Sequence, residues 1–216
     1  MCLPFAAIGV LACQPSSTEG PAPAPKPVNE RPLVRLETEH GDIEIEVRLD
    51  AAPISAGDFL AYVDAGLYDG EGFYRSVRPD NDPRKMGMSL IQGGILGMGE
   101  DNPPPRPLIA HELTTETGLS NTTGVVSIAR YEPGTGSAGF FFINIGDNAF
   151  LDYGGTRNPD GQGYATFGVV TVGMDVVRDI QQQATAGESP DPVTDNQYLT
   201  EPVTIIRAYR VDDEGS

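Results

Sequence analysis

The chain has 216 residues, enough for one ordinary domain with additional segments, and 39% of them are hydrophobic, which suffices for a core. Its 31 acidic residues against 14 basic ones give a net charge of −17. Because such a surface repels phosphate backbones, we expect no nucleic acid partner. Glycine and proline, with 26 and 19 residues, are frequent enough to favour a loop-rich β protein.

The N-terminus carries both cysteines of the chain, Cys2 and Cys13. We therefore expect neither a disulfide framework nor a cysteine-ligated metal site in the domain that follows. Residues 3–12 form an apolar run that is too short to span a bilayer as a helix. Small residues before a cysteine are typical of a bacterial lipoprotein signal. We predict a signal segment over residues 1–13 with Cys13 as the lipidation site. No lysine or arginine precedes Cys13, so an apolar N-terminus without this role is the alternative.

Residues 14–32 are rich in proline, alanine and serine and contain almost no large apolar side chain. Such a stretch cannot bury enough surface to fold. The alternation of proline and alanine at residues 21–25 favours an extended spacer, which a tether between an acylated cysteine and a domain requires. We predict a disordered tether over residues 14–32, a folded domain over residues 33–211 and an acidic tail over residues 212–216.

The folded domain begins with two stretches of alternating apolar and polar side chains. Residues 34–38 and 43–49 both have a period of two, and His40-Gly41-Asp42 joins them. We therefore expect an antiparallel hairpin with one solvated face. Further strands are predicted by short apolar runs bounded by glycine and proline. They cover residues 72–77, 89–93, 125–129, 140–145, 167–172 and 203–209.

Two segments have the periodicity of a helix. The first begins at Pro53 and ends at Gly66, and the second covers residues 174–183. Many short strands with only two helices favour a closed barrel or a sandwich. The side chains expected to face the core are Ile54, Phe59, Leu60 and Val63 in the first helix and Met174, Val176, Val177 and Ile180 in the second.

Six short sequence motifs occur in order through the middle of the domain. They are Phe73-Tyr74-Arg75, Ile91-Gln92-Gly93-Gly94, Ser127-Ile128-Ala129-Arg130, Phe141-Phe142-Ile143-Asn144, Asn148-Ala149-Phe150-Leu151-Asp152 and Tyr164-Ala165-Thr166-Phe167-Gly168. Together they resemble the cyclophilin family of peptidyl-prolyl cis–trans isomerases, and in particular its bacterial secreted branch. The resemblance extends over residues 34–210. It implies a mostly β fold, a closed eight-stranded antiparallel barrel capped by two α-helices, which matches the predicted order of elements.

The resemblance also implies a chemistry that needs no cofactor and no metal. A guanidinium that donates to the prolyl nitrogen stabilises the twisted state of an X-Pro bond. Arg75 matches the catalytic arginine of the family, whereas an isolated arginine on a strand would be an ordinary surface residue. His40 and His111 are far apart in the sequence and have no metal-binding spacing, so we predict no metal site.

Further positions match the substrate-binding residues of the family. Gln92 matches the glutamine that hydrogen-bonds the substrate backbone, and the Gly93-Gly94 pair after it predicts a turn. Ala129 matches a backbone position that binds the extended peptide. The remaining positions that the resemblance assigns to substrate binding are Leu90, Phe142 and Leu151, which line the proline pocket, together with Phe150 and Tyr164.

Two positions depart from the family pattern. Phe140 stands where the family has a glutamine, so a ring replaces a donor and acceptor in the substrate-binding site. Ser89 stands where an aromatic residue is usual, and Met86, Met88 or the loop itself then supplies that wall. The loop of residues 78–88 is longer than the usual connection, and a second long loop covers residues 153–163. Loops of this size are often functional, although inert insertions are equally compatible with the sequence.

We therefore expect a prolyl isomerase that acts on proline-containing segments of secreted or envelope proteins. It is expected to be a periplasmic monomer that contacts the membrane only through a lipid anchor. The alternative is a catalytically weak peptide-binding or chaperone-like module on the same fold. Phe140 and Ser89 favour this alternative, whereas Arg75, Gln92 and Phe142 favour catalysis.

Overall fold

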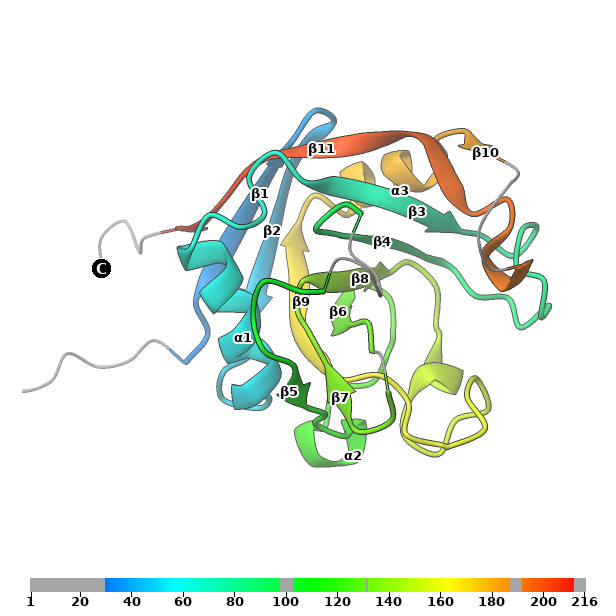
Figure 1. The fold of residues 1–216 in the computed structure, drawn as a ribbon, viewed down its shortest axis with the longest axis horizontal. Coiled ribbons are helices and arrows are strands. Elements are labelled where there is room, and N and C mark those ends of the chain that lie inside the picture. Colours follow the sequence, from blue (N-terminus) through cyan, green and yellow to red (C-terminus); the bar gives the residue numbers. More distant parts are fainter. Residues whose placement is uncertain (1–29, 98–102, 131, 187–191, 212–216) are drawn as a thin grey trace, which may run out of the picture.

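A computed structural model describes residues 30–97, 103–130, 132–186 and 192–211 (Figure 1). The predicted signal segment with Cys13, nearly all of the tether and the acidic tail lie outside the described residues. Within the described residues, no helix is both long enough and apolar enough to cross a membrane.

The described part of the chain contains eleven β-strands, three α-helices and two short 3-10 helices. The strands are β1 (Leu33–Thr38), β2 (Gly41–Val47), β3 (Gly72–Val77), β4 (Leu90–Gly94), β5 (Ile109–Ala110), β6 (Val125–Ile128), β7 (Thr135–Gly136), β8 (Phe140–Asn144), β9 (Thr166–Val172), β10 (Thr185–Ala186) and β11 (Tyr198–Val211). The helices are α1 (Pro53–Asp64), α2 (Thr114–Thr117) and α3 (Met174–Gln181), with the 3-10 helices η1 (Ala149–Leu151) and η2 (Pro192–Thr194).

Eight of these strands form a closed antiparallel barrel. Their order is β1-β2-β9-β6-β8-β4-β3-β11, and the pairing of β1 with β11 closes the sheet. β10 pairs with β11 outside this ring, while β5 and β7 form a separate small sheet. The predicted eight-stranded barrel is therefore confirmed, and closure leaves no long unpaired edge in this ring.

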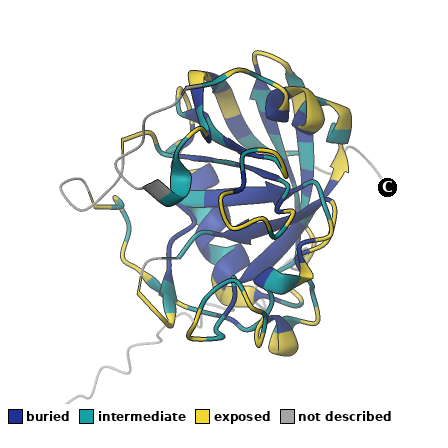
Figure 2. Ribbon diagram, turned by 90° about the vertical axis from the view of Figure 1, so that its right-hand side faces the viewer, coloured by how far each residue is buried: buried dark blue, intermediate teal, exposed yellow. Residues whose placement is uncertain are grey.

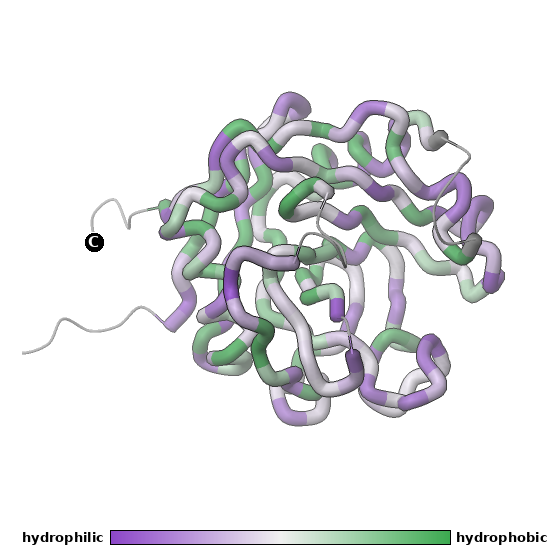
Figure 3. The backbone as a smooth tube through the Cα atoms, viewed as in Figure 1, coloured by the Kyte–Doolittle hydropathy of each residue, from purple (hydrophilic) through white to green (hydrophobic). Residues whose placement is uncertain are grey.

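The predicted hairpin is the β1–β2 pair. Thr38 faces Gly41 across the turn, and the Thr38 hydroxyl donates a hydrogen bond to the Gly41 carbonyl at 2.7 Å. The two strands bury five apolar side chains completely, and partly exposed charged residues alternate with them; the five are Val34, Leu36, Ile43, Ile45 and Val47. Figure 2 shows the burial of the whole fold, with buried strands inside and exposed residues mainly in the turns and loops around them. In Figure 3, the turn of the β1–β2 hairpin is hydrophilic, and its strands contain both hydrophobic and hydrophilic residues. Each buried branched side chain stabilises the barrel by about 1.5–3 kcal/mol.

Two helices pack on this barrel, as predicted. α1 packs against β9 and β11, and α3 packs against β2, β3 and β4. One inward prediction is wrong, because Ile54 is 44% exposed. Nine residues at about 100° each place Ile54 on the opposite side of α1 from the buried Val63. In α3, Val177 and Ile180 are fully buried, and Met174 and Val176 pack partly buried on the same core.

The sequence missed the shortest elements. β5, β7, β10 and α2 contain two to four residues each, too few to establish a period. The predicted start of the last strand, residue 203, lies five residues after the observed start. β11 begins at Tyr198, but its register with β3 shifts between Tyr198 and Val203, where Glu201 and Pro202 interrupt the apolar alternation.

The predicted turn at Gly93-Gly94 is wrong, because both residues belong to β4. A Cβ atom on Gly93 would lie 2.6 Å from the Cδ1 atom of Phe73, so only glycine lets β3 and the core approach this closely. Gly94 has a φ of +128° and faces the carbonyl group of Gly139. The two glycines therefore allow close packing that keeps Gln92 in register opposite Arg75 on β3.

Candidate active site

The centre of the site is Arg75 on β3. Its neighbours across the sheet are Gln92 on β4 and Tyr198 on β11. The Arg75 guanidinium donates from Nε and Nη2 to the Oε1 atom of Gln197, at 3.0 and 2.6 Å. It also donates from Nη1 to the Oε1 atom of Gln92 at 2.6 Å. The predicted catalytic arginine and the predicted glutamine are thus brought together.

The hydrogen bonds of Arg75 fix its guanidinium but do not neutralise its positive charge. Its two hydrogen-bond acceptors are neutral amides, and no carboxylate of the described residues forms an ion pair with it. Burial lowers the pKa of Arg75 from its ordinary value, while nearby tyrosines act in the opposite direction. Arginine nevertheless stays protonated at neutral pH. Three of its five N–H groups are used in these bonds, which leaves one on Nη1 and one on Nη2 for a ligand.

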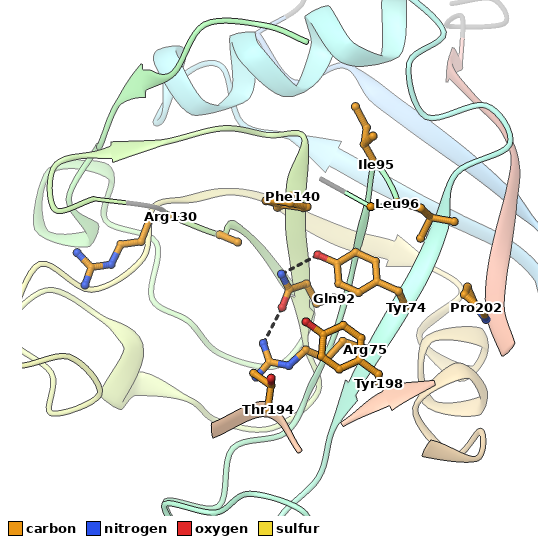
Figure 4. Close-up of a pocket in the computed structure, with 12 residues that line it drawn as sticks. Tyr74, Arg75, Gln92, Ile95, Leu96, Arg130, Phe140, Thr194, Tyr198 and Pro202 are labelled. Carbon is orange, nitrogen blue, oxygen red and sulfur yellow. Dashed lines mark hydrogen bonds between the residues drawn. The ribbon is translucent and has the colours of Figure 1, made fainter. Parts of the chain in front are cut away.

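Gln92 and Gln197 are themselves held by further hydrogen bonds. Gln92 donates from Nε2 to the hydroxyl oxygen of Tyr74 at 2.8 Å (Figure 4). Gln197 is fully buried and donates to the backbone carbonyl of Asn81 at 3.0 Å. Sequence reasoning missed both Tyr74 and Gln197. Tyr74 belongs to the Phe73-Tyr74-Arg75 motif. Gln197 follows the segment of residues 187–191, and no motif around it marks it as a site residue.

The loop of residues 78–88 is organised by the buried carboxylate of Asp82. This side chain is 2% exposed and accepts hydrogen bonds from the backbone N–H groups of Arg84, Met86 and Met88, at 3.1, 2.8 and 3.4 Å. Carboxylates that accept several backbone bonds commonly fix loop conformations. The loop thereby supports Gln197 through Asn81 and directs Met88 into the site.

Arg75 lies where two cavities meet. The smaller has a volume of about 170 Å³ and the larger about 770 Å³. Arg75, Gln92, Ala129 and Arg130 line both. The smaller cavity is completed by Met88, Leu90, Phe142, Leu151, Arg157 and Tyr164, and the larger one by Tyr74, Ile95, Leu96, Gly97, Phe140, Thr194, Tyr198 and Pro202 (Figure 4).

The smaller cavity has the apolar wall that the sequence predicted. Leu90, Phe142 and Leu151 are buried in one small cluster, and the rings of Phe142 and Tyr164 meet edge to face at 5.5 Å. Met88 belongs to the same cluster, so it supplies the wall that Ser89 cannot. Phe150 packs against this cluster but lines neither of the two cavities.

Ser89 has a structural role instead. Its backbone exchanges two hydrogen bonds with the side-chain amide of Asn148, at 3.2 and 2.9 Å. Its hydroxyl accepts a bond from Gln181 of α3 at 2.9 Å. The residue therefore joins β4 to the segment before η1 and to the last turn of α3, and its departure from the family pattern leaves the cavity intact.

Beside the smaller cavity, the carboxylate of Asp152 fixes the 3-10 helix η1. This side chain accepts two bonds from Asn121, from its backbone and its side-chain nitrogen, both at 2.8 Å. It also accepts a short bond from the Ser120 hydroxyl. Because Asp152 directly follows Leu151, this network fixes the position of Leu151 in the cavity wall.

The larger cavity is rich in aromatic rings. Tyr74 lies edge to face with Phe140 at 6.3 Å and stacks with Tyr198 at 6.1 Å. Phe140 is only partly buried and lies outside both core clusters. The structure thus places the predicted substrate-binding residue Phe140 in the groove rather than in the core. Its carbonyl accepts a hydrogen bond from the backbone N–H of Ala129 at 3.0 Å.

Comparisons with known proteins agree on one family. Residues 33–210 match the family model described as cyclophilin type peptidyl-prolyl cis-trans isomerase. The chain is 35% identical over 157 residues to peptidyl-prolyl cis-trans isomerase A of Dickeya dadantii (strain 3937), which covers 73% of this chain and 75% of the relative. It is 34% identical over 175 residues to peptidyl-prolyl cis-trans isomerase B of Escherichia coli (strain K12), covering 80% and 99% of the two chains.

Solved structures show the same fold. A cyclophilin type peptidyl-prolyl cis-trans isomerase of Cryptosporidium parvum superposes with a TM-score of 0.62 at 19% identity, covering 85% of this chain and 99% of the other. A second structure of that protein, obtained in the presence of the dipeptide Ala-Pro, gives a TM-score of 0.61. At this level of identity the likeness concerns the fold alone.

The position of Gln197 gives a prediction about stability. Gln197→Ala should lower the free energy of unfolding by about 1–3 kcal/mol, because two N–H groups of the partly buried Arg75 lose their acceptor. Chemical denaturation measures the change. Gln182→Ala is the matched control, since this glutamine is exposed and should change stability by less than about 0.5 kcal/mol. Equal stabilities of the two variants would show that Gln197 does not hold Arg75.

Proposed function

The chain belongs to the cyclophilin-type peptidyl-prolyl cis–trans isomerases, and we propose that Arg75 catalyses the rotation of X-Pro bonds in segments of extracytoplasmic proteins. The observation that carries this proposal is the position of the Arg75 guanidinium. It combines a full charge, two available N–H groups and a place at the junction of an open groove and a small cavity with an apolar wall. A proline ring fits the small cavity, and an extended peptide fits the groove.

The physical task is to weaken the resonance of one amide bond. Rotation about it has a barrier of roughly 18–20 kcal/mol, because the bond has partial double-bond character. As the bond twists, the lone pair of the prolyl nitrogen becomes localised and can accept a hydrogen bond. An N–H of Arg75 bonds this twisted state more strongly than either planar state, and it thereby lowers the barrier. No covalent bond breaks, so the reaction needs no cofactor.

The other residues of the site position the substrate. Phe142 and Leu151 offer an apolar wall to the proline ring. Gln92 holds Arg75 and has a second amide hydrogen that can meet the peptide backbone. Ala129 lies on the border of both cavities, where its backbone can bind an extended chain. Fixing the ring while the bond rotates converts binding energy into a lower barrier.

Arg75→Lys should lower turnover by about 10²–10³-fold, because a single ammonium cannot bond two glutamines and also reach the prolyl nitrogen. A protease-coupled isomerisation assay on a short Xaa-Pro peptide measures the effect, and thermal unfolding confirms the fold. Arg210→Lys is the control, since Arg210 pairs with Asp64 on the surface. An Arg75→Lys enzyme that is as fast as the wild type would refute the proposed mechanism.

One observation favours the alternative of a peptide-binding module with weak catalysis. Phe140 lines the groove with an apolar ring where the family has a donor and acceptor. Such a groove binds apolar side chains well, but it holds the peptide backbone less firmly. Phe140 and its partner Tyr74 lie beside Gln92 (Figure 4), so the change affects the groove and leaves the Arg75 bonds in place.

Phe140→Gln should therefore raise kcat/KM by up to about tenfold, because one recovered hydrogen bond contributes roughly 0.5–1.5 kcal/mol. Phe140→Leu is the matched variant, which removes the ring without adding a donor. The same peptide assay compares them. If both variants lose kcat/KM to the same extent, the ring itself binds the substrate and the groove is specialised for apolar segments.

For the cellular site of action, we infer from the sequence that the protein is lipid-anchored through Cys13. The support is the lipobox-like run before Cys13 and the proline-rich tether after it. Two or more acyl chains give stable anchoring, whereas one chain gives only marginal binding. The tether would hold a domain of strongly negative charge away from an anionic membrane surface.

Mass spectrometry of the protein produced from its native upstream region should find acyl chains on Cys13 and no Cys2 in the mature chain. Cys13→Ser should release the protein from the membrane fraction, whereas Cys2→Ser should leave it there. A Cys13→Ser variant that still fractionates with membranes, or a mature chain that begins before Cys13, would leave an isomerase without this anchor.

A further inference from the structure

The smaller cavity combines its apolar wall with an unusual concentration of positive charge. The cavity is lined by Arg75 on β3, by Arg130 in the segment just after β6 and by Arg157 in the loop of residues 153–163. The chain has only 14 basic residues against 31 acidic ones. Three guanidiniums around one cavity of about 170 Å³ therefore oppose the charge of the rest of the molecule.

Arg130 is a buried side chain with an unused donor. Its side chain is 8% exposed, and its guanidinium lies over the ring of Tyr164 at 5.6 Å. Nη2 donates to the Oδ2 atom of Asp160 at 2.7 Å. Nη1 is buried and has no hydrogen-bond partner among the described residues. A buried donor without an acceptor is costly, and an anionic ligand in the cavity would satisfy it.

The two long loops together place Arg157 at the cavity. The backbone N–H of Arg157 donates to the carbonyl of Phe150 at 3.2 Å. Its own carbonyl accepts a bond from Nη1 of Arg84, in the loop of residues 78–88, at 2.7 Å. The backbone N–H of Arg157 is thus fixed to η1, and its backbone carbonyl is fixed to the loop of residues 78–88. The loops that the sequence singled out therefore contribute one of the three arginines of the cavity.

We propose that this enzyme prefers X-Pro segments with a carboxylate next to the proline, and that Arg130 and Arg157 recognise that carboxylate. The inference rests on the proposed isomerase activity and adds a substrate class to it. The proline ring lies against Phe142, and the adjacent carboxylate meets the two arginines on the opposite wall. A paired carboxylate inside the cavity is little screened, whereas the repulsion from the acidic surface is screened within about 8 Å at physiological ionic strength.

The test is the ratio of kcat/KM for matched peptides that differ in one residue beside the proline. Glu and Gln are compared on either side of the proline, and a third pair compares a C-terminal proline as the free acid and as the amide. We expect the charged member of at least one pair to react about tenfold faster, as befits a charge-assisted hydrogen bond. The three pairs distinguish a side-chain carboxylate from a terminal one.

Variants then assign the preference to these arginines. Arg157→Gln should reduce the ratio to about one, whereas Arg210→Gln, with the same change in net charge, should leave it unchanged. Asp160→Asn should increase the ratio, because it removes the carboxylate that competes for Arg130. A loss of folding would lower the rate for every peptide and could not raise a ratio.

Two failures are distinguishable. Ratios near one for all three peptide pairs in an active wild-type enzyme would overturn this inference alone, and so would an Arg157→Gln enzyme that keeps the full preference. An enzyme without activity on any peptide would overturn the proposed function itself.

Discussion

The guanidinium of Arg75 is held by two side-chain amides, and the site depends on the fact that neither is charged. Gln92 and Gln197 accept three of its N–H groups and fix its plane. A carboxylate in either place would satisfy the same donors, but it would neutralise the charge that a twisting amide requires. Barrel closure provides this arrangement, because β11 pairs with both β1 and β3 and brings Gln197 to Arg75 over 122 positions of sequence.

Much of this structure could be predicted from the sequence, because many of its determinants are local. The buried faces follow from the alternation in β1 and β2 and from the apolar residues of α3. The six sequence motifs, taken in order, predict the barrel. The sequence did not show what depends on distant partners. Gln197 has no motif of its own, and the two glycines of β4 are explained only by Phe73 and Gly139 across the sheet. Ile54 was assigned by its apolar character although its angle on α1 places it outside.

The two long loops illustrate how the family pattern can change while the site persists. Asp82 organises one loop and places Met88 where Ser89 leaves the cavity wall incomplete. Arg84 joins this loop to Arg157 in the other. Ordering such loops costs conformational entropy, which these hydrogen bonds offset. The result is a proline-sized cavity with a positive wall inside an acidic protein, so local charge and overall charge have opposite signs.

The most direct test of the account is a structure of the protein with a short bound peptide that contains Ala-Pro. The account predicts that the proline ring lies against Phe142 and Leu151 in the smaller cavity. It also predicts that an Nη atom of Arg75 lies within about 3.2 Å of the prolyl nitrogen or its adjoining carbonyl oxygen, while Gln92 and Gln197 keep their bonds to it. A proline ring in the larger cavity, or an Arg75 that contacts only its two glutamines, would contradict the account.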